Sequence, residues 1–305
     1  MPYPIVYVYT EDYYWLAGML LEAPNSKTVY LHTHGTASNF YDELFVETLT
    51  EKFLENNISM LTVNNRGANV YDPYQQTGLA VEKFEDCIKD IDAWIELALA
   101  EGYENIILSG HSLGAEKAVY YMSKGKYADK IKKLVLLAPA NSTGYHIFDH
   151  DGEPSKKNKK RLSQLLKEAL QLINENKGDE FLSRDAYGGI APKSAESFVD
   201  FLGRDSELAR ALPFHTGKLE LFSRIKTPVL AVIGDQEEFT AIRQKEALEL
   251  MEKENSLTKT VMVKNCDHDF QGREDRLAEV VLRFLLLQDQ PASDEKNQTS
   301  TTSIN

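Results

Sequence analysis

The sequence contains little cysteine and no long apolar run. Its 305 residues include two cysteines, Cys87 and Cys266, and two cysteines cannot hold a fold of this size together, so a disulfide scaffold is excluded. No window reaches the ~18 apolar residues of a membrane span, and the first residues lack a basic segment before an apolar one. We therefore expect a soluble, cytoplasmic protein that makes no use of a membrane.

Positive charge is also scarce. Lys and Arg together number 34 against 47 Asp and Glu, which gives a formal net charge of −13. Because nucleic-acid phosphates require a basic stripe, this balance argues against a nucleic-acid partner. Hydrophobic residues make up 42% of the chain, enough for a sizeable core. The sequence gives no indication of oligomeric state.

A short apolar run ends in the pentapeptide GHSLG, residues 110–114, and a helix-forming stretch follows it. Where a strand turns sharply into a helix, a serine is held in a strained backbone conformation, and glycines two residues to either side relieve the crowding. This context favours a nucleophile elbow with Ser112 as the nucleophile. The alternative is a glycine-flanked serine at an ordinary strand-to-helix turn.

A serine hydroxyl needs a base to take its proton and an acid to orient that base. With this kind of elbow the two follow in the order acid, histidine. An apolar run at 227–233 is typical of a buried parallel strand and ends in Gly-Asp-Gln-Glu-Glu at 234–238. After a helix and another strand comes His268, ahead of an amphipathic helix at about 273–287. We predict His268 as the base and an acid from the 234–238 turn.

The reaction also needs an oxyanion hole, formed by two backbone N–H groups. One is predicted to be the N–H of Leu113. The other should come from the loop after the strand at 28–31, where we expect the N–H of Thr36, with Gly35 as the alternative and a plain strand-to-loop turn as the remaining possibility. His111 lies inside the elbow, so we expect its ring to line the pocket, in packing or in substrate contact.

Together these motifs resemble the α/β-hydrolase superfamily. The likeness rests on HTHGTAS (32–38), NNRG (64–67), GHSLG (110–114), LAPA (137–140), TPVLAVIGD (227–235) and CDHDF (266–270), in this order over residues 3–287. It implies an α/β fold with a mostly parallel central sheet, helices on both faces, a Ser/acid/His triad and a helical cap inserted after the sixth strand. The stretch at 34–41 and the NNRG turn are most similar to a branch that includes fungal siderophore esterases.

The acid position departs from the usual pattern of that superfamily. There the acid commonly stands three residues after the glycine that ends the seventh strand, as an aspartate. Here that position is Glu237, whereas Asp235 directly follows Gly234 and Glu238 comes one residue later. Glutamate is an accepted alternative, so we predict Glu237 as the triad acid, with Asp235 and then Glu238 as alternatives.

The alternation of strands and helices stops after the strand at 133–137. We predict a catalytic domain made of residues 1–144 and 222–288, a cap at 145–221 and a disordered polar tail at 289–305. Within the cap, we expect the lysine-rich run at 156–161 to be a solvated loop before a helix near 162–175. Four aromatic residues are candidates for substrate binding on the inner wall of the cap, or else for its core: Tyr187, Phe198, Phe201 and Phe214.

A cluster of four residues in the predicted cap bears on metal binding: His146, Asp149, His150 and Asp151. We interpret it as a polar loop, because the ordered ligand spacing of a zinc or iron site is not recognisable. We expect no metal and no cofactor.

The leading functional prediction is a serine hydrolase that cleaves a small, largely apolar carboxylic ester through an acyl-enzyme intermediate, with the ester as its partner. The same triad would serve an acyltransferase or a thioesterase, because the pocket selects the leaving group and the acceptor. A non-catalytic binding protein with the same fold is the alternative from another class.

Overall fold

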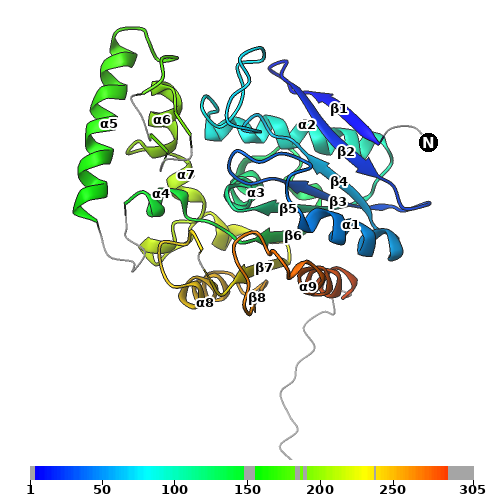
Figure 1. The fold of residues 1–305 in the computed structure, drawn as a ribbon. Helices are drawn as coiled ribbons and strands as arrows, with labels where there is room; N and C mark the ends of the chain where they lie inside the picture. Colours follow the sequence, from blue (N-terminus) through cyan, green and yellow to red (C-terminus); the bar gives the residue numbers. More distant parts are fainter. Residues whose placement is uncertain (1–3, 148–154, 183–185, 188–190, 237, 288–305) are drawn as a thin grey trace, which may run out of the picture.

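The computed structural model of the chain describes residues 4–147, 155–182, 186–187, 191–236 and 238–287 (Figure 1). Its centre is an eight-stranded sheet with the order β1-β2-β4-β3-β5-β6-β7-β8. The strands are β1 (Ile5–Tyr9), β2 (Trp15–Leu21), β3 (Thr28–Thr33), β4 (Ser59–Val63), β5 (Asn105–His111), β6 (Ile131–Leu137), β7 (Val229–Gly234) and β8 (Thr258–Val263). Strand β2 pairs antiparallel with β1 and with β4, while the other pairs are parallel.

Helices cover both faces of this sheet. On one face lie α1 (Phe45–Glu55) and α9 (Glu274–Leu286), and on the other α2 (Cys87–Ala100) and α3 (Leu113–Lys124) (Figure 1). The alternation along β3 shows why two layers are needed: Val29 and Leu31 pack in one buried cluster and Tyr30 in the other. Apolar side chains on both sides of a parallel strand must be covered from both sides. The predicted α/β-hydrolase fold is confirmed.

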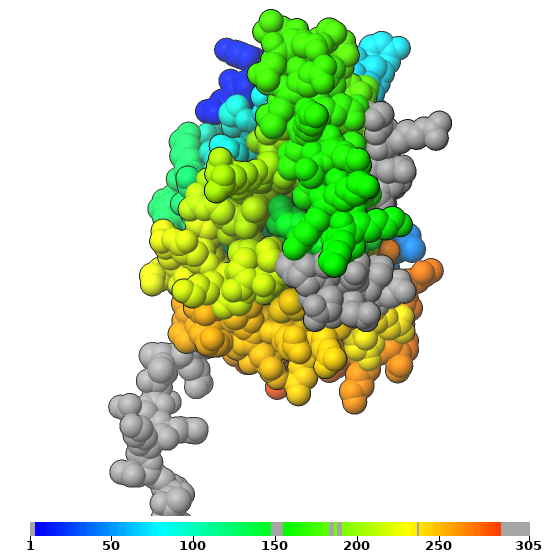
Figure 2. Space-filling model, turned by 90° about the vertical axis from the view of Figure 1, so that its left-hand side faces the viewer, coloured from blue at the N-terminus to red at the C-terminus, as the bar shows by residue number. Residues whose placement is uncertain are grey.

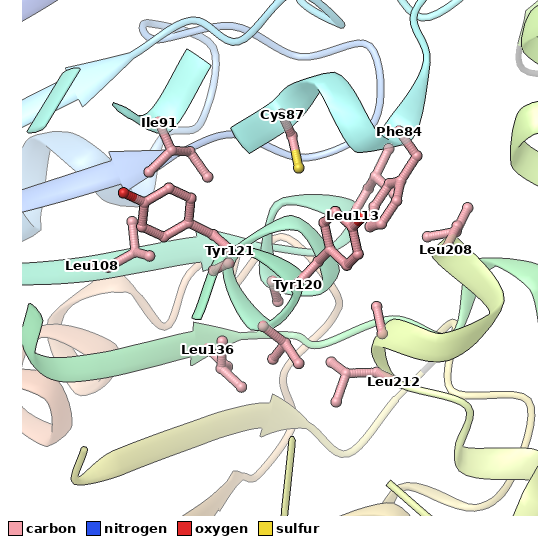
Figure 3. Close-up of a cluster of buried hydrophobic side chains, with 14 of the residues drawn as sticks. Phe84, Cys87, Ile91, Leu108, Leu113, Tyr120, Tyr121, Leu136, Leu208 and Leu212 are labelled. Atoms are coloured by element: carbon pink, nitrogen blue, oxygen red, sulfur yellow. The ribbon is translucent and has the colours of Figure 1, made fainter. Parts of the chain in front are cut away.

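Helix α3, which starts directly after Ser112, packs into a cluster of buried apolar side chains (Figure 3). Its buried residues Leu113, Tyr120 and Tyr121 belong to the same cluster as residues of β5, β6 and α2, including Leu108, Leu136, Cys87 and Ile91. Burial raises the pKa of the Cys87 thiol well above its usual range, so this cysteine serves as a small apolar side chain. The helix that positions the serine is therefore fixed by the core.

Between β6 and β7 the chain forms an inserted segment, in which the structure describes α4 (Ser142–Tyr145), α5 (Lys156–Asn174), α6 (Ala195–Leu202) and α7 (Leu208–Ala211). Figure 1 places α5 and α6 to one side of the sheet, and Figure 2 shows α5 exposed along its length on that side. After this segment come β7, α8 (Gln244–Glu254), β8 and α9.

The predicted loop at 156–161 is wrong, because these lysine-rich residues form the first turns of α5. Ser155 caps the helix by accepting a hydrogen bond from the Asn158 backbone N–H at 3.3 Å. Lysine is a good helix former when its side chain reaches solvent, and the buried positions of this helix, Leu165 and Ala169, keep its other face on the protein. The predicted tail at 289–305 lies outside the described residues. In the described part of the chain, no helix has the length and apolarity to cross a membrane.

Candidate active site

Ser112 occupies the strained conformation that the elbow requires. Its backbone has φ 54° and ψ −121°, between the end of β5 and the start of α3, a region that costs a non-glycine residue about 1–3 kcal/mol. The glycines on either side are sterically required. A Cβ on Gly114 would lie 2.5 Å from the carbonyl oxygen of Thr33, and one on Gly110 would overlap the backbone of Gly114. The elbow geometry of the motif is present as predicted.

The acid that contacts His268 is Glu238. Its Oε2 lies 2.5 Å from His268 Nδ1, and its Oε1 accepts the backbone N–H of Gly234 at 2.9 Å. The Glu238 side chain has 0% exposure, so the contact is shielded from water. The turn after β7 thus brings the fourth residue past Gly234 back onto the end of its own strand.

The other two candidate acids differ in what the structure shows of them. Asp235 is directed elsewhere, since its carboxylate accepts the backbone N–H of Cys266 at 3.1 Å and so ties the two loops together. Glu237 lies outside the described residues. Among the described carboxylates of this turn, Glu238 is the one placed on His268, although it ranked last in the prediction.

Gly35 lies close to the nucleophile but cannot serve as the alternative oxyanion donor. A Cβ at this position would come within 3.0 Å of the Ser112 Cβ, which explains the glycine. Its backbone N–H, however, donates to Oε1 of Glu43 at 2.9 Å. An N–H already bound to a carboxylate is not available to a developing oxyanion. That part of the prediction is wrong, and Thr36, which lines the same cavity as Ser112, remains the candidate.

Glu43 is a residue that the sequence analysis missed. Besides Gly35, its carboxylate contacts Nδ1 of His111 at 2.8 Å and Nε2 of His32 at 2.7 Å, and its side chain is 7% exposed. Nε2 of His111 in turn donates to the backbone carbonyl oxygen of His268 at 3.0 Å. One carboxylate therefore connects the loop after β3, the elbow and the histidine loop. In the sequence, Glu43 is an acid two residues before α1, a position that by itself indicates no site.

The charge state of His111 follows from this contact. Burial alone would lower the pKa of the ring, but the Glu43 carboxylate opposes it and raises the pKa to about 9. His111 is thus a cation near neutral pH, and Glu43 has its pKa held well below the usual range, despite burial, by the same pair and by His32. The expectation that His111 lines the pocket agrees with its position, and its polar atoms are bound to protein groups.

The NNRG turn at 64–67 is hydrogen-bonded to the loop after β3. The side-chain oxygen of Asn64 accepts the backbone N–H of Phe40 at 2.9 Å, and the Asn65 N–H donates to Nε2 of His34 at 3.3 Å. Arg66 anchors the turn through ion pairs with three carboxylates, Asp12, Asp86 and Asp90. These ion pairs fix the NNRG turn, whose asparagines contact the loop after β3.

Ser112, His268 and Thr36 line one cavity of about 410 Å³. Four further rings line it and contact one another in series from His268 to Tyr187, whose hydroxyl is bonded to the Thr36 side chain. We call them the aromatic wall: Phe239, Tyr145, His146 and Tyr187. The ring centroids lie 4.7 Å apart from His268 to Phe239, then 5.0, 5.7 and 4.7 Å at each following step. Tyr145, His146 and Tyr187 come from the inserted segment.

Three of the predicted wall residues, Phe198, Phe201 and Phe214, do not reach the cavity. Their exposed fractions are 0–1%, and they belong to the hydrophobic core. Phe201 packs beneath Tyr187, with 5.9 Å between ring centroids, and carries the ammonium of Lys193 on its face at 3.3 Å. The apolar face of α6 points to the core, so the substrate-binding assignment of these residues is wrong. Tyr187 is the predicted aromatic that faces the cavity.

Within the described part of the chain, no group of three or more His, Cys, Asp or Glu residues could hold a metal ion. Of the cluster noted in the sequence, His146 belongs to the aromatic wall. Asp149, His150 and Asp151 lie outside the described residues.

An eight-stranded, mostly parallel sheet with a serine elbow at the end of β5 defines an α/β hydrolase. The sequence matches the family model described as serine aminopeptidase, S33, over residues 22–274. This match covers most of the chain, and the protein belongs to that family.

Solved structures share the fold at low sequence identity. The chain is similar to Est1E from Butyrivibrio proteoclasticus, solved with ferulic acid bound, at 17% identity and a TM-score of 0.65, covering 92% of this chain and 98% of that one. It is also similar to the Pyrococcus furiosus esterase Pf2001, at 17% identity and a TM-score of 0.59, covering 93% of this chain and 89% of that one. A monoglyceride lipase from Saccharomyces cerevisiae is similar at 13% identity and a TM-score of 0.61, covering 94% of this chain and 96% of that one. No curated protein sequence matches the chain.

Proposed function

We propose that the protein is a serine hydrolase that cleaves a small, largely apolar carboxylic ester through an acyl-enzyme intermediate. The observation that carries the proposal is the placement of Ser112, in the strained elbow conformation, and of the His268–Glu238 pair on one cavity. Fold relatives that are named as esterases or as a lipase favour an ester over an amide.

In this mechanism Ser112 attacks the ester carbonyl while His268 takes its proton. Glu238 orients the imidazole and stabilises the imidazolium that forms. The backbone N–H groups of Leu113 and Thr36 bind the oxyanion of the tetrahedral intermediate. His268 then gives the proton to the departing alcohol, and water repeats the sequence on the acyl-enzyme.

We also propose that the inserted segment at 145–221 is the cap of the catalytic domain formed by 1–144 and 222–288. Tyr145, His146 and Tyr187 support this role, because they bring most of the aromatic wall to the cavity. An aromatic wall suits an apolar acyl chain or alcohol, and a covered site excludes water during acylation.

The direct test is labelling by a fluorophosphonate probe together with hydrolysis of short p-nitrophenyl esters. The wild-type chain should label and turn over, and Ser112→Ala should do neither. Ser123→Ala is the matched control, because this serine lies on the same helix α3 but is exposed and bonds only to the Tyr120 carbonyl.

The family description names aminopeptidases, so aminoacyl p-nitroanilides serve as the contrasting substrates. Faster turnover of these amides than of the esters would contradict the ester assignment. Absence of both labelling and turnover in the wild-type chain would contradict the hydrolase itself.

A further inference from the structure

Among the residues that the structure describes, His146 is the histidine for which no hydrogen-bond partner is found. His32, His34, His111, His215 and His268 each bond to a carboxylate, hydroxyl, amide or carbonyl group. Within the described part of the chain, the His146 ring makes only ring contacts, to Tyr145 and Tyr187. The residue is 3% exposed. A buried polar group is normally paired, so its partner is expected to be something that enters the cavity.

The position of His146 is that of a substrate contact. Its ring lines the same cavity as Ser112 and lies third in the row of rings that runs from His268 through Phe239 and Tyr145. A group bound at His146 therefore lies in the same cavity as a carbonyl group that reacts at Ser112.

The chemistry of the ring narrows what it can bind. Burial, with the positive charges of Arg161 and Lys193, lowers the pKa of His146 to about 3, so the imidazole is neutral and presents one donor and one acceptor. A neutral ring gives a carboxylate no charge partner. The nearby ammonium of Lys193 is already bound to the Leu79 carbonyl and the Ser197 hydroxyl. A hydroxyl group, which can both accept and donate, matches the ring best.

We propose that His146 binds a hydroxyl group of the substrate, so that the preferred esters carry a hydroxyl on the part that lies along the aromatic wall. This inference rests on the proposed ester hydrolysis and adds polar recognition to a largely apolar pocket. His146 acts here as a specificity residue, since Ser112, His268 and Glu238 perform the reaction.

The test compares two matched series of esters. In the first, ethyl ω-hydroxyalkanoates of increasing length are compared with ethyl esters in which a methyl group replaces the hydroxyl. In the second, acetate monoesters of α,ω-diols are compared with alkyl acetates of the same length. At one length in one series, the hydroxyl ester should have the higher kcat/KM, by about tenfold, which corresponds to about 1.4 kcal/mol and is in the range expected for one hydrogen bond. The responding series identifies whether the acyl or the alcohol part lies on the wall.

Two variants assign the preference to the ring. His146→Phe keeps an aromatic side chain but removes both nitrogens, and should bring the ratio of the two kcat/KM values to about one. His146→Gln, which retains a donor and an acceptor, should keep part of the preference. His215→Phe, the same change at a histidine outside the cavity, should keep all of it.

Each outcome decides the inference. Equal kcat/KM for both members of every pair in the wild-type chain overturns the hydroxyl site but leaves the proposed hydrolase intact, whether or not the variants fold. A preference that survives in His146→Phe assigns the hydroxyl contact to another residue and also overturns the inference. Failure to hydrolyse any ester, with no fluorophosphonate labelling, overturns the proposed function together with the site.

Discussion

Glu43 and His111 form a buried pair, 2.8 Å from Oε1 to Nδ1, directly beside the nucleophile elbow. The same oxygen accepts the Gly35 N–H, and His111 holds the backbone of His268 through its other nitrogen. The pair therefore connects the loop after β3 with the backbone of the loop that carries His268.

Replacing Glu43 by Gln should lower kcat by about tenfold or more while changing KM little, because misplacing groups by a fraction of an ångström weakens transition-state contacts. Steady-state kinetics on one p-nitrophenyl ester would measure this. Glu47→Gln, an exposed acid in the first turn of α1, is the matched control. A variant with unchanged kcat would show that the pair is dispensable for positioning.

The pair should also make stability depend on pH. The folded-state pKa of His111, about 9, is above its ordinary value of 6.5. Its contribution is therefore complete below about pH 6.5 and is lost as pH rises through about 9, with an amplitude on the order of 2–4 kcal/mol. Melting temperatures of the wild-type chain and of His111→Gln, measured between pH 6 and 10, should converge at the alkaline end. A constant difference across this range would argue against a charged His111.

The acid of the triad can be tested by three single changes. Glu238→Gln should reduce kcat by about 10³-fold or more, because an amide no longer holds the imidazole in the required tautomer and charge state. Asp235→Asn and Glu237→Gln should reduce kcat far less, since Asp235 is bound to the Cys266 backbone. If Glu237→Gln proves the most damaging of the three, the family's usual spacing applies and the Glu238 contact is not the catalytic one.

The elbow glycines should not tolerate a methyl group. Gly110→Ala would place its Cβ against the backbone of Gly114, and we expect a loss of about 2 kcal/mol or more of unfolding free energy. Gly272→Ala is the comparison variant, in which the backbone is strained but the added methyl group is not crowded. This glycine has φ 70°, and no heavy atom lies within 4 Å of the added Cβ. Its cost should be about 1 kcal/mol. Denaturant unfolding of both variants would compare them, and similar losses would mean that crowding at the elbow is unimportant.

The sequence predicted those features that depend on local patterns. The elbow and the strands expected at 28–31, 133–137 and 227–233 follow from apolar runs and from glycine spacing. Which carboxylate reaches His268 could not be predicted, because it depends on how the turn after β7 folds back onto Gly234. Likewise, the amphipathic pattern of α6 indicates that Phe198 and Phe201 share a face, but not that this face meets the core. The hydrogen bond from the Gly35 N–H to Glu43 depends on the conformation of the loop between them, which a short sequence pattern does not predict.

The core that holds α3 also fixes the inserted segment. Leu208 and Leu212, on and beside α7, share a cluster with Leu113 and Tyr120 of the nucleophile helix (Figure 3). Swinging this part of the insert away from the sheet would expose both leucines, at about 1.5–3 kcal/mol for each. We therefore expect the part of the insert around α7 to stay packed on α3 while a substrate enters, so that the helix directly after Ser112 also supports one side of the insert.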